Sequence, residues 1–245
     1  MKFITKSNFI LAAIILANLV TVKLYFENNL TLYIHPRYVL FTMIMNCISL
    51  VIVCMLIVTM IAKKAHTAPR GISLGQPSIV ALLLAFLVIA GLIFPAKSLS
   101  STTVNQRTIT TNIDGEPVCP DIDESSPPKE FQDWDRLLSG CDEPLKYQGR
   151  SIVIEGFVYD GHGLNAQDTF SVARFKISCC AVDAQPMLLT IAEQDWSSRF
   201  KANQWLHIEG SVQPKWVNEK LTAVVEPKNI KKISQPQDPY DFLKF

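Results

Sequence analysis

Two long apolar stretches without a single charged residue constrain this chain most. They are "YVLFTMIMNCISLVIVCMLIVTMIA" at 38–62 and "PSIVALLLAFLVIAGLIFPA" at 77–96. A hydrocarbon core of about 30 Å is crossed by a helix that rises about 1.5 Å per residue, and both stretches are long enough for this. We therefore predict transmembrane helices near 38–62 and 77–96.

The N-terminal stretch at 8–26 is also apolar, although Lys23 interrupts it. A lysine near a helix end can extend its ammonium group to the membrane interface. The alternative is a cleaved signal peptide, because Lys2 and Lys6 precede the apolar run. No small-x-small cleavage site follows the run, so we favour a retained helix and expect about three membrane spans.

Basic residues indicate the orientation of these spans. Lys2 and Lys6 precede the first span, and Lys63, Lys64 and Arg70 lie between the second and the third. Cytoplasmic loops carry the excess of Lys and Arg. We therefore expect a multi-pass protein of the cell membrane with a cytoplasmic N-terminus and everything after residue 97 outside the cytoplasm.

The net charge of +1 conceals an asymmetry along the chain. Residues 1–98 hold eight Lys and Arg against one acidic residue, whereas residues 99–245 hold fifteen against twenty-one. Nucleic-acid binding requires clustered positive charge, so the acidic outer part argues against a nucleic-acid partner.

Composition divides the chain into a transmembrane region at 1–98, a linker at 99–130 and an outer domain at 131–245. The linker is rich in Ser, Thr, Pro and acidic residues and has no sustained hydrophobic period, which is typical of a stalk. The outer domain opens with "FQDWDRLLSG", whose apolar spacing and final glycine predict a short amphipathic helix.

The rest of the outer domain is rich in strands. Three alternating or apolar runs, a helical pattern around Trp196 and Phe200, and two further runs follow one another. Five short strands with a helix between the third and fourth are the element order of an OB-like barrel, and a generic α+β domain is the alternative. The predicted fold class is thus a membrane-anchored composite of about three helices and an extracytoplasmic, mostly-β OB-like barrel.

Cys179 and Cys180 stand side by side in "RFKISCCAVDAQP". Neighbouring residues on a strand point to opposite faces, so the two thiols can cooperate only if the strand ends there, and "AVDAQP" is turn-like. Four interpretations stay open: simple packing, a disulfide with Cys119 or Cys141, a metal or redox site that includes Asp183, and an interface role. Ordinary disulfide geometry argues against a bond between the two neighbours.

Other candidate residues carry weaker signals. His35, Pro36 and Arg37 lie just before the second apolar stretch, where contact with lipid headgroups or with a partner is expected. No nucleophile, base and orienting group can be assembled from the sequence, so we do not expect an enzyme.

Several of these segments together resemble a bacterial family of two-component membrane permease subunits. The similarity covers nearly the whole chain through "YIHPRY", "YQGRSIVIEGFVYD", "ARFKISCCAVDAQP", "QWLHIEGSV" and "DPYDF". The distinctive positions that match are His35, Pro36, Arg37, Arg174, Cys179, Cys180, Asp183, Ala184, Pro239 and Tyr240. Cys119 and Cys141 lie outside these motifs, so a disulfide between those two is the simplest pairing.

The resemblance implies an auxiliary subunit that works with a separate multi-helix permease in the lipid bilayer and helps to move a small solute, an amino acid or a metal ion. The alternative is a membrane-anchored extracytoplasmic module that binds a metal or senses through its thiols. Cys179, Cys180 and Asp183 are the candidate solute or metal site. No cofactor is assigned apart from a divalent metal as a candidate, and the sequence does not identify the solute.

Overall fold

The computed structural model describes residues 2–65, 86, 93, 96–107, 119–122, 127–139, 141, 143–161, 168–217 and 219–242. The chain divides into two compact units, Met1–Lys97 and Ser98–Phe245. Each unit is described by itself below.

Two helices joined by a short connection make up the described part of the first unit. They are α1 (Lys2–Phe26) and α2 (Val39–Ala65), with the 3-10 turns η1 (Leu30–Leu32) and η2 (Pro36–Tyr38) between them. Asn18 of α1 donates from Nδ2 to Ser49 Oγ of α2 at 3.1 Å, and Asn46 Nδ2 donates to Asn18 O at 3.4 Å. These amide contacts join the two helices through polar side chains in an otherwise apolar pair.

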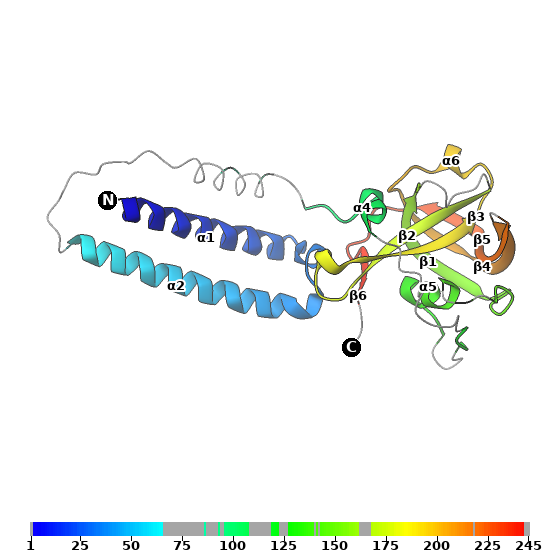
Figure 1. Cartoon of the computed structure of the whole chain (residues 1–245), viewed down its shortest axis with the longest axis horizontal. Helices are drawn as coiled ribbons and strands as arrows, with labels where there is room; N and C mark the ends of the chain where they lie inside the picture. The colour runs from blue at the N-terminus through cyan, green and yellow to red at the C-terminus, as the bar shows by residue number, and fades with distance from the viewer. Residues whose placement is uncertain are drawn as a thin grey trace. The chain divides into compact units, whose positions relative to one another are not determined.

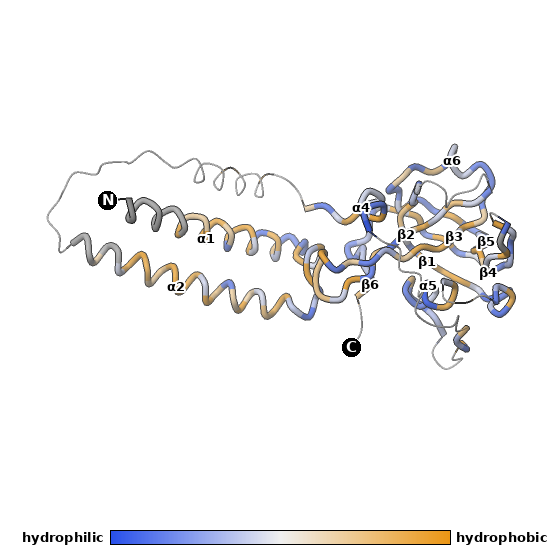
Figure 2. The backbone as a smooth tube through the Cα atoms, in the orientation of Figure 1, coloured by the Kyte–Doolittle hydropathy of each residue, from blue (hydrophilic) through white to orange (hydrophobic). Residues whose placement is uncertain are grey.

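The predicted number of membrane-spanning helices is wrong. Among the described residues only one helix is long and apolar enough to cross a membrane, at Pro36–Thr59. A shorter apolar helix lies at Leu11–Phe26 within α1. Figure 2 shows hydrophobic residues along the coloured parts of both helices. The third predicted span, 77–96, lies almost entirely outside the described residues.

A small barrel of five strands with one added strand forms the second unit (Figure 1). The sheet order is β1-β4-β5-β3-β2-β6, and an additional β1–β2 pairing closes the first five strands. The β3–β5 pairing is parallel, so the helix α6 (Trp196–Arg199) and β4 form the crossover between those strands. The strands are β1 (Ser151–Tyr159), β2 (Thr169–Ile177), β3 (Gln185–Ala192), β4 (Trp205–Val217), β5 (Lys220–Lys232) and β6 (Tyr240–Phe242).

Alternating apolar side chains of the strands fill the inside of the barrel. Ile152 and Ile154 of β1 and Leu206 and Ile208 of β4 are buried in one hydrophobic cluster. The helix α5 (Phe131–Ser139) adds Phe131, Trp134 and Leu137 to the same cluster, as its three-to-four spacing predicts. The predicted order of five strands with a helix after the third therefore agrees with this unit, whereas the membrane part of the predicted fold class does not.

Part of the predicted linker belongs to the barrel. The helix α4 (Ser101–Gln106) buries Ser101 and Val104, and Asn203 Oδ1 accepts from both the backbone N–H and the hydroxyl of Ser101. Asn105 Oδ1 accepts from the hydroxyl of Tyr159 at 2.6 Å. We refer to residues 98–107 as the strap, because this segment contacts the barrel through Ser101 and Asn105.

Candidate functional site

The two neighbouring cysteines lie where β2 ends and before β3 begins. A 3-10 turn, η3 (Ala181–Asp183), occupies this connection, and we call residues 178–184 the corner. Cys179 is exposed and Cys180 half-buried, and both are free thiols. Their Sγ atoms are 3.6 Å apart. Because β2 ends at Ile177, the two thiols are not forced onto opposite faces of a strand and can lie next to each other.

Asp183 holds the backbone of the corner in place. Its carboxylate accepts from the N–H groups of Cys179 at 2.7 Å, Ser178 at 3.2 Å and Cys180 at 3.4 Å. In return the Cys180 side chain accepts from the backbone N–H of Asp183. This reciprocal capping box fixes the positions of both cysteines relative to the carboxylate.

Arg107 of the strap also binds the corner through hydrogen bonds. Its guanidinium donates to the carbonyl oxygens of Ala184 and Ala181, the latter at 2.9 Å. Ala181 is the first residue of η3, and Ala184 directly follows it. Arg107 carries no signal in the sequence that would have marked it as part of the site, because only the fold brings residue 107 next to residues 181–184.

The protonation of the corner follows from these contacts. Hydrogen bonding to the Asp183 carboxylate, together with the Cys180 thiol, raises the pKa of Cys179 to about 12. Burial opposes ionisation of Asp183, but hydrogen bonds from the Cys179 thiol and from the backbone N–H groups outweigh it and lower the pKa of Asp183. At neutral pH Cys179 is therefore a thiol, and Asp183 is a carboxylate.

Replacing Asp183 with asparagine should speed alkylation of Cys179 at least about tenfold near pH 8. The variant removes the carboxylate whose hydrogen bond, and then whose charge, raise the pKa of Cys179. A larger fraction of Cys179 then becomes thiolate, and the lower nucleophilicity of a less basic thiolate offsets only part of that gain. The rate is measured with iodoacetamide and peptide mass spectrometry. The control is Asp195→Asn in an exposed turn, and equal rates in all three proteins would contradict the assigned role of Asp183.

The corner does not present a ready three-ligand metal cluster. Among the residues that the structure describes, no group of three or more His, Cys, Asp or Glu side chains is arranged to hold a metal ion. The carboxylate of Asp183 faces three backbone N–H groups. Cys179, Cys180 and Asp183 are thus brought together, but the Asp183 carboxylate binds the backbone, and only the two sulfurs are left as candidate ligands for a metal ion.

His35, Pro36 and Arg37 lie at the 3-10 turn η2, directly before α2. His35 Nδ1 accepts from the Arg37 backbone N–H at 3.2 Å and caps η2, whose first residue is Pro36. The Arg37 guanidinium lies 4.9 Å from the ring centroid of Tyr38 and donates to its hydroxyl. These residues belong to the first unit, and their contacts show a helix-starting role.

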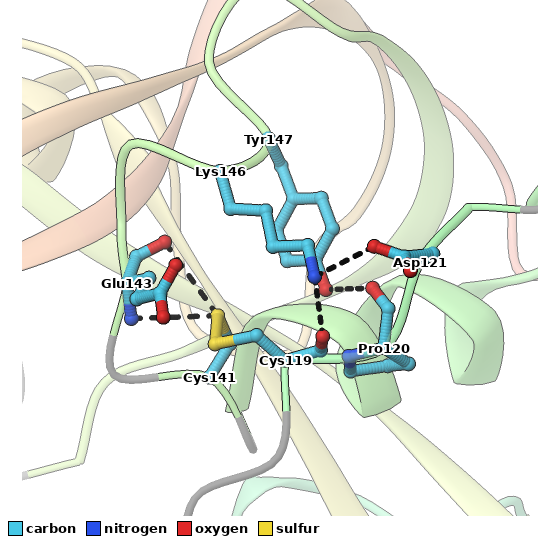
Figure 3. The surroundings of a disulfide bond; sticks show 7 residues. All are labelled: Cys119, Pro120, Asp121, Cys141, Glu143, Lys146 and Tyr147. Atoms are coloured by element: carbon cyan, nitrogen blue, oxygen red, sulfur yellow. Dashed lines mark hydrogen bonds and ion pairs between the residues drawn. A yellow bond between two sulfur atoms is a disulfide. The ribbon is translucent and has the colours of Figure 1, made fainter.

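Cys119 and Cys141 are joined by a disulfide (Figure 3). The bond ties the segment 119–122 to the loop after α5. Lys146 supports the junction by pairing with Asp121 at 2.8 Å and by donating to the Cys119 carbonyl, and the Tyr147 hydroxyl donates to the Pro120 carbonyl at 2.6 Å. The ring of Tyr147 is itself buried in the core, so this part of the predicted linker is fixed to the barrel.

Removing the disulfide should lower the free energy of unfolding by about 3 kcal/mol under oxidising conditions. The double variant Cys119→Ser/Cys141→Ser frees a loop that spans a sequence separation of 22 residues, so the unfolded chain gains conformational entropy. Denaturant unfolding of the wild-type protein with and without reductant provides the comparison. If reductant destabilises the double variant as much as the wild type, the disulfide is not the cause.

A buried ion pair fastens β6 to the barrel. Arg174 of β2 lies with Nε 2.7 Å from Asp241 Oδ1, and both side chains are largely buried. The contact is an ion pair rather than an aligned hydrogen bond, while the guanidinium donates to the carbonyls of Glu155 and Asp238. Asp241 Oδ2 also accepts from the Gln132 backbone N–H. The "DPYDF" motif thus contains a structural partner of Arg174 that sequence reasoning did not name.

A histidine between two carboxylates was also missed. His207 of β4 lies with Nδ1 2.9 Å from Glu155 Oε1 and Nε2 3.2 Å from Glu209 Oε1. Hydrogen bonding to Glu155 is the main cause of the raised pKa of His207; burial opposes it, and the hydrogen bond to Glu209 adds a smaller increase. The register that pairs Glu155 with His207 across β1 and β4 could have indicated this contact.

Comparison with known proteins identifies the two parts of the chain. Residues 9–110 match the DUF1980 N-terminal domain, and residues 132–243 match the DUF1980 C-terminal domain. Each match covers less than half of the chain. The barrel with its corner lies in the segment that matches the DUF1980 C-terminal domain. Most of α1, all of α2 and the strap lie in the segment that matches the DUF1980 N-terminal domain.

The chain is also similar to UPF0703 protein YcgQ of Bacillus subtilis (strain 168). The two are 29% identical over 104 residues, which make up 42% of this chain and 36% of the relative. The alignment thus covers about a third of the length of that relative. Neither the relative's name nor the DUF1980 domain names state an activity.

Proposed function

We propose that this chain is an accessory subunit of a membrane permease, anchored by α2 and presenting its barrel in an oxidising compartment. A separate polytopic subunit would move the solute, an amino acid or a metal ion, and this chain would bind or deliver it. The observation that carries the proposal is the apolar helix at Pro36–Thr59.

The side chains of α2 support an anchoring role. Many large apolar residues of this helix are exposed among the described residues, and an uncovered apolar surface of this extent favours a nonpolar medium. They are Leu40, Phe41, Ile44, Met45, Ile48, Val51, Ile52, Met55, Leu56 and Val58.

The lack of charged residues in α2 at 39–62 suggests that a separate partner carries out the transport step. The contacts of Asn18 with Ser49 and Asn46 are polar contacts of the kind that join helices in membranes. Residues 39–62 contain no Asp, Glu, Lys or Arg, whereas ion pathways in membranes are usually marked by such residues. A separate subunit would therefore supply the pathway.

The disulfide favours an oxidising location for the barrel. Disulfides such as Cys119–Cys141 persist in secreted and extracytoplasmic proteins and are rare in the cytosol. The acidic balance of residues 99–245 fits a barrel whose partners are not nucleic acids.

A second role is favoured by the corner itself. Two thiols held 3.6 Å apart on the surface of a small barrel would also suit a membrane-anchored module that binds a metal or senses through its thiols without a partner. The two roles differ in whether a polytopic protein accompanies the chain.

The test is affinity purification of the tagged full chain from membranes in mild detergent. The accessory role predicts a polytopic protein in constant ratio with the chain, and a chain that elutes alone favours the second role. Ile52→Lys in α2 should clearly reduce membrane retention, because a lysine at the centre of a membrane span costs about 3 kcal/mol. Val153→Lys on the barrel is the matched control, since the two side chains are 53% and 52% exposed. If Ile52→Lys stays in the membrane fraction like its control, the anchoring proposal is wrong.

A further inference from the structure

We propose that Cys179 and Cys180 chelate a thiophilic divalent cation of the Zn²⁺ class through their two sulfurs, as an exchange site rather than a structural one. The inference rests on the proposed function, in which a metal ion is one of the two candidate solutes, and it names that ion as the ligand of the corner. The binding itself needs no partner subunit.

The spacing of the two sulfurs suits this ion. Zn²⁺ binds thiolates at about 2.3 Å in tetrahedral geometry, which places two sulfurs of one ion about 3.8 Å apart. The observed Sγ–Sγ distance is 3.6 Å, so both sulfurs can reach one ion with little movement. Thiolates also favour Zn²⁺ over the hard cations Mg²⁺ and Ca²⁺, which prefer oxygen ligands.

The corner is built so that this spacing is maintained. The Asp183 carboxylate holds three consecutive backbone N–H groups, at residues 178–180. Arg107 donates to the carbonyls of Ala181, the first residue of η3, and of Ala184, which follows η3. A pair of ligands fixed by such surrounding hydrogen bonds loses less freedom when the ion binds.

The binding step is an exchange of protons for metal, with no oxidation or reduction. Each Zn–S bond forms as an S–H bond breaks, and the two protons leave to solvent. Binding should therefore release about two protons per ion and become tighter as the pH rises.

Open coordination positions make this a site for transfer. The described residues supply two sulfurs at the corner, while a tetrahedral ion takes four ligands. Water, or a donor or acceptor protein, would fill the other positions. Structural zinc sites use four protein ligands, so a two-sulfur site on an exposed corner suits an ion that is received and passed on.

The test is calorimetric titration of the reduced-thiol full chain in detergent with Zn²⁺, without any partner. The parent protein is Cys47→Ser/Cys54→Ser, which leaves Cys179 and Cys180 as the only free cysteines because Cys119 and Cys141 are bonded. We expect one ion per chain, release of about two protons, and affinity that increases between about pH 7 and about pH 8. Adding Cys179→Ser or Cys180→Ser should weaken binding at least about tenfold.

Two results would overturn the proposal: a parent protein that does not bind Zn²⁺, or a Cys179→Ser/Cys180→Ser variant that binds as tightly as the parent. Near-ultraviolet circular dichroism of each variant checks that the barrel is folded, and Ser178→Ala is a control that leaves both thiols in place. If the chain does not bind Zn²⁺ but co-purifies with a polytopic protein, the metal site is rejected and the accessory role is kept. If the chain binds Zn²⁺ but purifies alone, the metal site is kept and the accessory role is rejected.

Discussion

Replacing Arg174 with methionine should lower the free energy of unfolding at pH 7 by about 3 to 5 kcal/mol. The variant leaves Asp241 without its cation, although this carboxylate is only 7% exposed. The carbonyls of Glu155 and Asp238 also lose their donor. Denaturant unfolding of the full chain, followed by the fluorescence of its tryptophans, measures the effect.

The loss should depend on pH. Burial raises the pKa of Asp241 in the folded protein, and Arg174 and the Gln132 N–H lower it only in part. Without Arg174 the pKa rises further, so protonation at low pH relieves the penalty. A raised carboxyl pKa contributes stability at low pH that is lost as the pH rises through the folded value. The variant should therefore be closer to wild type near pH 4 to 5 than at pH 7.

Two further variants separate the ion pair from general disruption. Arg174→Met/Asp241→Leu should recover much of the stability, because an apolar pair can replace a buried ion pair at small cost. Arg199→Met removes a more exposed partner, since Arg199 is 53% exposed in its pair with Glu193, and should change the stability by about 1 kcal/mol or less. Equal losses in Arg174→Met and Arg199→Met would contradict the structural role of the buried pair.

Replacing Gly210 with alanine should lower the free energy of unfolding by about 3 kcal/mol or more. Gly210 lies at the irregularity in the β4–β5 ladder. An added Cβ would overlap the carbonyl oxygen of Glu226 and lie 2.9 Å from Pro227 Cα. Both neighbours are backbone atoms of the paired strand, so the clash can be relieved only by moving β5.

Gly149→Ala is the matched control for this effect. Gly149 has a φ of 78°, but nothing lies within 4 Å of the position that its Cβ would take. The cost should be only the left-handed conformation, about 1 to 2 kcal/mol. A Gly210→Ala variant no less stable than Gly149→Ala would show that the strands are not so close at the irregularity.

Local patterns predicted the barrel well. The alternation in β1 and β2, the helix after the third strand, and the spacing of Phe131, Trp134 and Leu137 depend only on neighbours in the sequence. Such periodicity reports which face of each element is buried. The pairing of β3 with β5 and the attachment of β6 join distant segments, and a single sequence carries little information about them.

The membrane part and the linker were harder to predict. The 8–26 stretch is apolar enough to suggest a span, but among the described residues only the helix at Pro36–Thr59 is long and apolar enough to cross a membrane. Residues 99–130 are polar in composition, yet Val104 and Ile122 pack onto the barrel and Cys119 is bonded to Cys141. Composition describes average solvation and does not show which few side chains make tertiary contacts.

The candidate site was predicted in part. The turn-like residues after Cys180 indicated a corner where both thiols and Asp183 could meet, and they do. The role of Asp183 as the frame of the backbone depends on hydrogen bonds to three amides, and Arg107 reaches the corner only through the fold. Neither relation has a signature in the spacing of residues.

X-ray absorption at the zinc edge tests the central claim about the corner most directly. The full chain in the Cys47→Ser/Cys54→Ser background is loaded with one equivalent of Zn²⁺. Two sulfur neighbours at about 2.3 Å, with lighter atoms completing the shell, are the predicted result. A shell of nitrogen and oxygen alone would contradict chelation by Cys179 and Cys180.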